Sequence, residues 1–162
     1  MIPHRLNMAV LALASLALAS CQRSDLLGEE LIPDSPDHAL ALELEGRWAV
    51  GSFREDGQEL VGAEATYDYA AVDFDYEGGD GGGLEITLAS ATRQMHLDGL
   101  YAADAERGVV SFDGEVAVSY GEGQKATEPM TFELAVDRDG DDVITLSGEV
   151  GGGEWIVRAT RD

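Results

Sequence analysis

Residues 137–142 read Asp-Arg-Asp-Gly-Asp-Asp, and several carboxylates around one glycine turn can coordinate a hard cation such as calcium. The run departs from an EF-hand loop, because Gly140 follows the second aspartate and no glutamate stands at the closing position. An Asp-Gly hairpin between two strands explains the same residues, so both interpretations stay open. The calcium ligands would be Asp137, Asp139, Asp141 and Asp142.

A second acidic cluster leads into the glycine-rich segment 78–83. On a strand, Asp73, Asp75 and Glu77 would share one face, opposite Phe74 and Tyr76, and such a face is normally solvated. The single Gly-Gly-Asp-Gly fragment is similar to glycine-aspartate calcium repeats, which need neighbouring copies to stack on. The glycines do not form a phosphate-binding loop, because a strand pattern follows them instead of Lys and Ser or Thr.

Hydrolytic catalysis has few candidate residues. His96 lies between two apolar residues, and neither Gly-x-Ser-x-Gly nor His-Glu-x-x-His occurs in the chain. We therefore expect no catalytic residues, and we keep a hydrolase that uses His96 or a pair of carboxylates as an alternative function.

The N-terminus has the pattern of an export signal. A short start with His4 and Arg5 precedes an apolar run over 8–19, which is shorter than the roughly 20 residues that span a bilayer. The run ends in Leu18-Ala19-Ser20-Cys21, and Cys21 is the only cysteine of the chain. This motif resembles the lipobox of bacterial lipoproteins. The alternative is a free cysteine at the end of an ordinary secretory signal.

The lipobox resemblance implies removal of residues 1–20, diacylation of the Cys21 thiol and acylation of the new amino terminus. Two or more acyl chains give stable membrane anchoring. Because Gln22 rather than aspartate follows the cysteine, the resemblance favours the outer membrane if the host has two membranes. We expect a lipid-anchored protein of the bacterial cell envelope.

The chain is strongly acidic, with 32 Asp and Glu against 10 Lys and Arg. Loss of Arg5 with the signal takes the formal charge from −22 to −23, and Lys125 is the only lysine. Nucleic-acid binding needs a basic footprint, so we exclude it. A soluble, self-repelling surface is expected, and attraction of cations or of a basic envelope partner is the sharper alternative.

Three segments are expected: a signal peptide over 1–20, an acidic, proline-containing tether over 21–38, and one β domain over 39–162. From residue 39 apolar residues alternate with polar ones, as in half-buried strands, and Leu40, Leu42 and Leu44 share the parity of Trp48. We expect no helix in the domain. The parity slips near Ala70 and Ala71, where a β-bulge would restore it. Similar alternation recurs over 84–88, 116–120, 130–136, 144–147 and 155–159.

Turn residues separate these runs. Asp56-Gly57 and Asp139-Gly140 are hairpin signals, whereas Asp113-Gly114 fits either a tight hairpin or the interior of one long strand. The pattern predicts an all-β, antiparallel meander of eight to ten strands, with a closed barrel favoured over a sandwich.

Gly46-Arg47-Trp48 resembles the Gly-x-Trp motif of lipocalin-like barrels, in which a basic residue near the end of the chain packs over the tryptophan. Arg158 or Arg161 would fill that role. The resemblance implies a cavity for a small apolar ligand. We therefore expect a non-catalytic binding or structural module, without a cofactor, for such a ligand or for an envelope partner. One alternative is a calcium-dependent adhesion or assembly module, and the other is the hydrolase named above.

Overall fold

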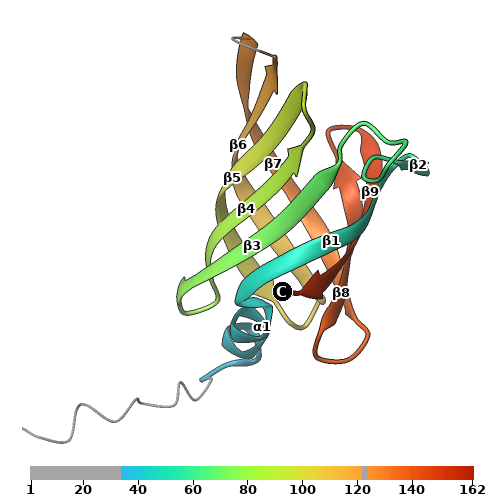
Figure 1. Cartoon of the computed structure of the whole chain (residues 1–162). Helices are drawn as coiled ribbons and strands as arrows, with labels where there is room; N and C mark the ends of the chain where they lie inside the picture. Colours follow the sequence, from blue (N-terminus) through green and yellow to red (C-terminus); the bar gives the residue numbers. More distant parts are fainter. Residues whose placement is uncertain (1–33, 122–123) are drawn as a thin grey trace, which may run out of the picture. The chain divides into compact units, whose positions relative to one another are not determined.

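The computed structural model describes residues 34–121 and 124–162. A single described helix, α1 (Pro36–Leu44), precedes nine strands (Figure 1). No helix in this part of the chain has the length and apolar character needed to span a bilayer. The strands are β1 (Gly46–Glu55), β2 (Gln58–Glu59), β3 (Tyr69–Gly78), β4 (Gly81–Ala89), β5 (Arg93–Asp104), β6 (Val109–Tyr120), β7 (Gln124–Arg138), β8 (Val143–Val150) and β9 (Gly153–Arg161).

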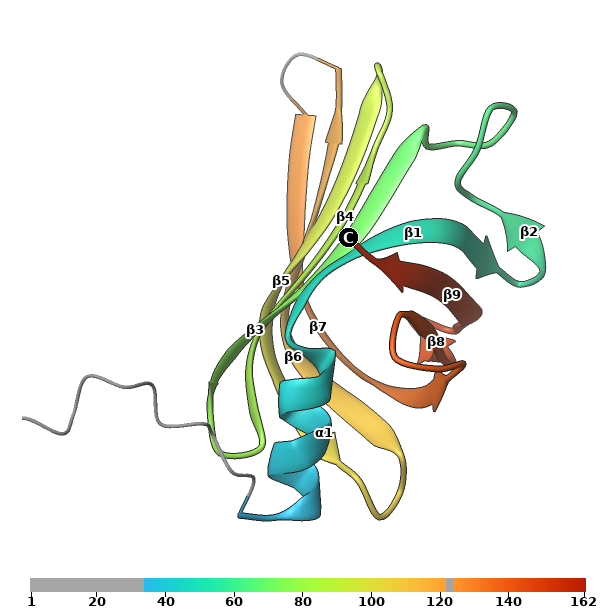
Figure 2. The ribbon, with the colours of Figure 1, turned by 60° about the horizontal axis from the view of Figure 1, so that its bottom comes forward.

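The strands form one antiparallel meander that closes on itself. β1 pairs with β3, each strand from β3 to β8 pairs with the next one along the chain, and β9 returns to pair with β1 (Figure 2). β2 forms only a short hairpin with the end of β1, so the closed barrel has eight strands. The predicted all-β fold, the strand count and the closed barrel are confirmed.

The interior of the barrel is filled by one continuous apolar core. Phe112 stacks on Phe132 with 4.7 Å between ring centroids, and Trp155 lies 5.9 Å from Phe132 and 4.9 Å from Phe53. A void large enough for water would leave accessible surface on the side chains around it. Eleven core side chains, which together come from all eight strands of the barrel, have none: Trp48, Phe53, Val72, Ile86, Leu88, Leu97, Val110, Leu134, Ile144, Leu146 and Val157.

The expected strand over residues 40–44 is wrong, because this segment belongs to α1. Ser35 caps the helix by accepting a hydrogen bond from the backbone N–H of His38, and Pro36 occupies the first turn, where its missing N–H costs nothing. The run of Ala, Leu and Glu that follows favours helix. Ala41 and Leu44, one helical turn apart, are fully buried. The leucine alternation was therefore coincidental, and the helix starts inside the expected tether.

The predicted bulge at Ala70 and Ala71 is also wrong. The register between β3 and β4 runs unbroken from Tyr69 to Tyr76. Tyr67 precedes the strand, and Tyr69 points outward and is exposed, so Ala70 takes the inward position. Register shifts occur instead in β1, next to Gly51, and at the end of β3, between Tyr76 and Gly78.

Two Asp-Gly pairs have different roles in the fold. Asp56 and Gly57 have φ values of +50° and +78°, which suits the two-residue hairpin between β1 and β2. Asp113 and Gly114 lie inside β6, which is one continuous strand. Gly114 faces Gly99 of β5, and a Cβ on Gly114 would lie 2.6 Å from the Gly99 Cα. Here glycine permits close approach of two strands rather than a turn.

Candidate functional site

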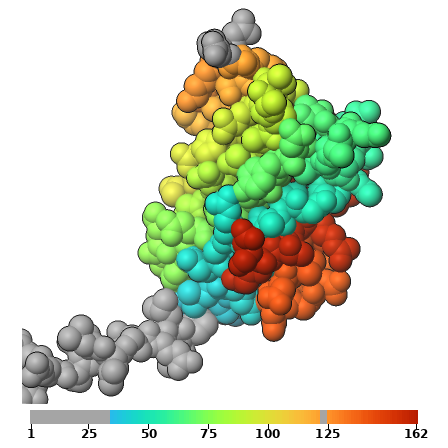
Figure 3. Space-filling model, in the orientation of Figure 1, coloured from blue at the N-terminus to red at the C-terminus, as the bar shows by residue number. Residues whose placement is uncertain are grey.

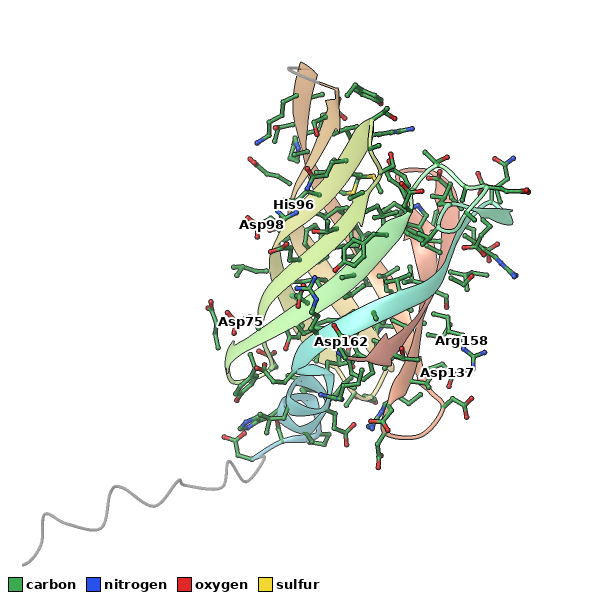
Figure 4. All side chains as sticks on the ribbon, viewed as in Figure 1. Asp75, His96, Asp98, Asp137, Arg158 and Asp162 are labelled. Atoms are coloured by element: carbon green, nitrogen blue, oxygen red, sulfur yellow. The ribbon has the colours of Figure 1, made fainter. Side chains whose placement is uncertain are left out.

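The four aspartates proposed as calcium ligands lie at the hairpin between β7 and β8. Asp139 is 3.5 Å from Arg158, and Asp141 is 3.6 Å from Arg138. Within the described ranges, no group of three or more His, Cys, Asp or Glu side chains is arranged to hold a metal ion. Figure 4 places Asp137 and Arg158 on the same side of the barrel, separated in the sheet by Thr145 of β8.

Four carboxylates form a ladder across the outer face of β3, β4, β5 and β6. Asp73 is the cross-strand neighbour of Glu85, Glu85 of Asp98, and Asp98 of Glu115. Like charges directly opposite each other on a sheet are destabilising. Arg47, 3.5 Å from Asp73, neutralises only one end of the ladder. Burial raises the pKa of the Asp73 carboxyl, Arg47 opposes that shift, and the charge of Glu85 adds to it.

This acidic ladder borders a hollow of about 450 Å³, which also has Leu100 in its wall. Leu100 is 62 % exposed, the highest value among the large apolar residues described. Figure 4 shows Asp75, Asp98 and His96 on this face of the barrel. Sequence reasoning grouped the alternate acidic residues of β3, but the rest of the ladder comes from three other strands, whose register the sequence does not reveal.

His96 lies on the outer face of β5, beside the acidic ladder. Its Nδ1 is 3.2 Å from the Thr87 hydroxyl and 3.6 Å from a Glu85 carboxylate oxygen. With Ser119 and Lys125, His96 lines a hollow of about 290 Å³. In the described part of the chain no hydrogen bond joins His96 to Ser119, so the structure does not assemble a serine-histidine nucleophile there.

Helix α1 packs against one end of the barrel, next to the last residues of β9 (Figure 3). The Arg161 guanidinium lies over the Trp48 indole, 4.4 Å from the ring centroid. The basic residue expected over this tryptophan is therefore Arg161, whereas Arg158 points outward toward Asp139. The indole N–H of Trp48 donates to the Leu44 backbone carbonyl at 2.8 Å, and this hydrogen bond joins the core to the helix.

The end of the barrel opposite α1, called the far end here, consists of the start of β3, the turn from Ser90 to Thr92 between β4 and β5, and the end of β6. Arg93 begins β5 at this end. Its guanidinium lies over both the Tyr67 and the Tyr120 ring, 5.5 and 5.0 Å from their centroids. The Arg93 Nε is buried and has no hydrogen-bond partner in the described residues.

Arg93 also lines a hollow of about 300 Å³ at the far end, together with Ser90, Thr92 and Ser119. Sequence reasoning missed Arg93, because nothing in its local sequence marks it and both tyrosines come from distant parts of the chain. No local signal could have found the cluster.

The fold and its surface define a small antiparallel barrel with a filled interior, covered at one end by a helix and hollowed on its outside, an architecture compatible with a binding module. Neither a protein-family model, a curated protein nor a solved structure matches this chain. Cys21, the predicted lipidation site, lies outside the described residues.

Proposed function

We propose that this chain is a lipid-anchored lipoprotein of the bacterial envelope, whose barrel is a non-catalytic binding module. The lipobox residues Leu18 to Cys21 support the anchor. The chain enters the barrel domain at α1, so an anchor at Cys21 would hold the α1 end and leave the far end available to ligands or partners. We place the binding surface at the far end.

The filled interior is the observation that carries this placement. Because the core fills the middle of the barrel, we place ligand binding at its surface, including the side chains at its open end. Two hollows near the far end share Gln94 and Ser119, and a third lies in the connection between β2 and β3. Partly buried apolar side chains lie at the same end and offer contacts to an apolar ligand: Leu60, Val61, Met95 and Val118.

The anchor is tested with Cys21→Ser in the native host. We expect the wild-type protein in the membrane fraction, with a mass increase that corresponds to its acyl chains. The variant should be released and should lack that increase. Membrane retention of an unmodified Cys21→Ser protein would show that another segment anchors the chain.

The binding surface is tested with two tryptophan substitutions on the outer face of β6. Ala117→Trp fills the hollow beside His96, whereas Ser111→Trp places the same side chain toward the α1 end. Both proteins are purified from native membranes, checked by circular dichroism, and extracted for mass spectrometry. Ala117→Trp should lose a co-purifying small molecule that the wild type and Ser111→Trp retain. Equal recovery from all three proteins would place binding elsewhere.

A further inference from the structure

We propose that Arg93 binds the oxyanion of a small amphiphile, a carboxylate or phosphate joined to an apolar body, at the far end of the barrel. This inference rests on the proposed function, because it names the ligand chemistry of the same end.

Within the described residues Arg93 has no carboxylate partner, although acidic residues outnumber basic ones about three to one in the chain. Among the other described arginines, five lie within 4.0 Å of a carboxylate oxygen, and Arg161 donates to two backbone carbonyls of the α1 end. Arg93 makes no such ion pair in residues 34–121 and 124–162. Its Nε is buried without an acceptor, as is that of Arg138, but Arg138 pairs with Glu43 through its terminal nitrogen. A buried, unsatisfied donor on a charged group is costly, and a ligand oxygen would remove that cost.

Two aromatic rings orient the guanidinium. Tyr67 and Tyr120 lie within cation–π distance of Arg93. A planar guanidinium held in one orientation presents its N–H groups as a fork that matches a carboxylate or a phosphate. The Tyr67 phenol is protonated at neutral pH and can donate a hydrogen bond to an anion. Burial raises its pKa further, and the charge of Arg93 opposes that shift.

The walls around Arg93 suit an anion. Its hollow contains the hydroxyls of Ser90 and Thr92 and the amide of Gln94, and the adjoining hollow contains Lys125. None of the residues that line either hollow is acidic. Glu55, a carboxylate of the same end, accepts a hydrogen bond from the Trp155 indole at 3.1 Å.

An apolar body has its own contacts at this end. Met95 lies two residues from Arg93 on the same side of β5, and Val118 is its direct neighbour on β6. Both side chains are only partly buried at the edge of the core. An alkyl chain laid over them would remove apolar surface from water, while the oxyanion met Arg93.

The test uses the full-length protein with Cys21→Ser, so that its own acyl chains cannot compete. Titration calorimetry measures decanoate, decyl phosphate and 1-decanol below micelle formation, and inorganic phosphate alone. We expect both anionic amphiphiles to bind about tenfold or more tightly than 1-decanol, as a charge-assisted hydrogen bond predicts. Binding of inorganic phosphate should be much weaker than that of decyl phosphate.

The added substitution Arg93→Gln should abolish the preference for the anions and leave the affinity for 1-decanol within about threefold. Arg158→Gln removes the same charge from an exposed arginine that pairs with Asp139, and should keep the preference. Melting curves check that each variant is folded. If Arg93→Gln fails to fold, Tyr120→Ala, at a 49 % exposed position, removes one of the two rings that contact the guanidinium and should weaken decanoate binding.

Equal affinities for all three amphiphiles, or an anion preference that survives Arg93→Gln, would overturn the assignment while leaving the proposed function intact. Phosphate binding as tight as decyl phosphate binding would overturn the amphiphile part. The proposed function fails separately, when co-purification is insensitive to Ala117→Trp.

Discussion

Arg161 stacks on Trp48 and at the same time donates hydrogen bonds, both 2.7 Å long, to the backbone carbonyls of Glu43 and Glu45. One side chain from the last strand thus covers the buried tryptophan of the first strand and satisfies carbonyls at the C-terminal end of α1. Those carbonyls have no partner within the helix itself. The contact joins barrel closure to the packing of α1.

Replacing Arg161 should therefore weaken both the closure of the barrel and the packing of α1. We expect Arg161→Ala to lower the free energy of unfolding by about 1–3 kcal/mol, from the lost cation–π contact and the two charge-assisted hydrogen bonds. Urea unfolding followed by tryptophan fluorescence measures the change. Arg158→Ala, also on β9 but engaged only with exposed Asp139, is the matched control and should stay within about 0.5 kcal/mol. Equal losses in the two variants would show that the Trp48 contact adds nothing.

Repulsion within the acidic ladder should lower the free energy of unfolding. Asp98 has Glu85 and Glu115 as direct cross-strand neighbours, so Asp98→Asn is expected to raise the free energy of unfolding by about 0.2–1 kcal/mol. Added NaCl should shrink the difference, because salt screens exposed charges. Glu106→Gln, in an exposed turn, is the control for the change in net charge. Destabilisation by Asp98→Asn at low salt would mean that the ladder is not repulsive.

Alkaline pH should destabilise the barrel through Tyr101. Burial raises the pKa of Tyr101 to about 12, above the value of about 10 expected in the unfolded chain. The folded state holds this proton more tightly, so stability is complete below pH 10 and declines as the pH rises toward 12. Urea midpoints should fall less steeply over this range in Tyr101→Phe. Tyr69→Phe, at an exposed position, should follow the wild type; parallel curves for all three would contradict the shift.

The first part of β7, Gln124–Leu134, should be protected against pairing with strands of other chains. β7 pairs with β8 only from Ala135 to Arg138, so no described strand is paired with its Gln124–Leu134 edge. A Cβ on Gly148 would lie 2.3 Å from the Glu133 carbonyl oxygen, so the odd-numbered residues of β7 turn their backbone groups to this side. Pro129 therefore removes a donor from the edge.

Pro129→Val restores that donor. We expect concentration-dependent association by sedimentation velocity in 0.5 M NaCl, where charge repulsion is screened. Thr127→Val adds apolar surface to the same edge without a new backbone N–H, and should remain at the sedimentation coefficient of the wild type. Association of both variants alike would assign the effect to the side chains.

The strand pattern was predictable because a barrel buries one face of each strand, and burial of Leu84, Ile86 and Leu88 beside exposed Glu85 is written directly into the alternation. The helix was not predictable from the same rule. Residues 40–44 alternate like a strand, yet α1 buries Ala41 and Leu44, which follow helical spacing. A capping serine and a proline at residues 35–36 were the local signals that favoured the helix.

The sequence by itself determined the all-β class, the alternating core and most turns, since these depend on neighbours along the chain. The sequence left the role of Asp113-Gly114 open, because glycine suits a tight turn and a close approach of two paired strands equally well. Only the tertiary structure showed the close approach of Gly114 to Gly99, the ladder from Asp73 to Glu115, and the contact of Arg93 with two tyrosines. Each depends on strand register, which sets residues from distant segments side by side and is fixed only when the barrel closes.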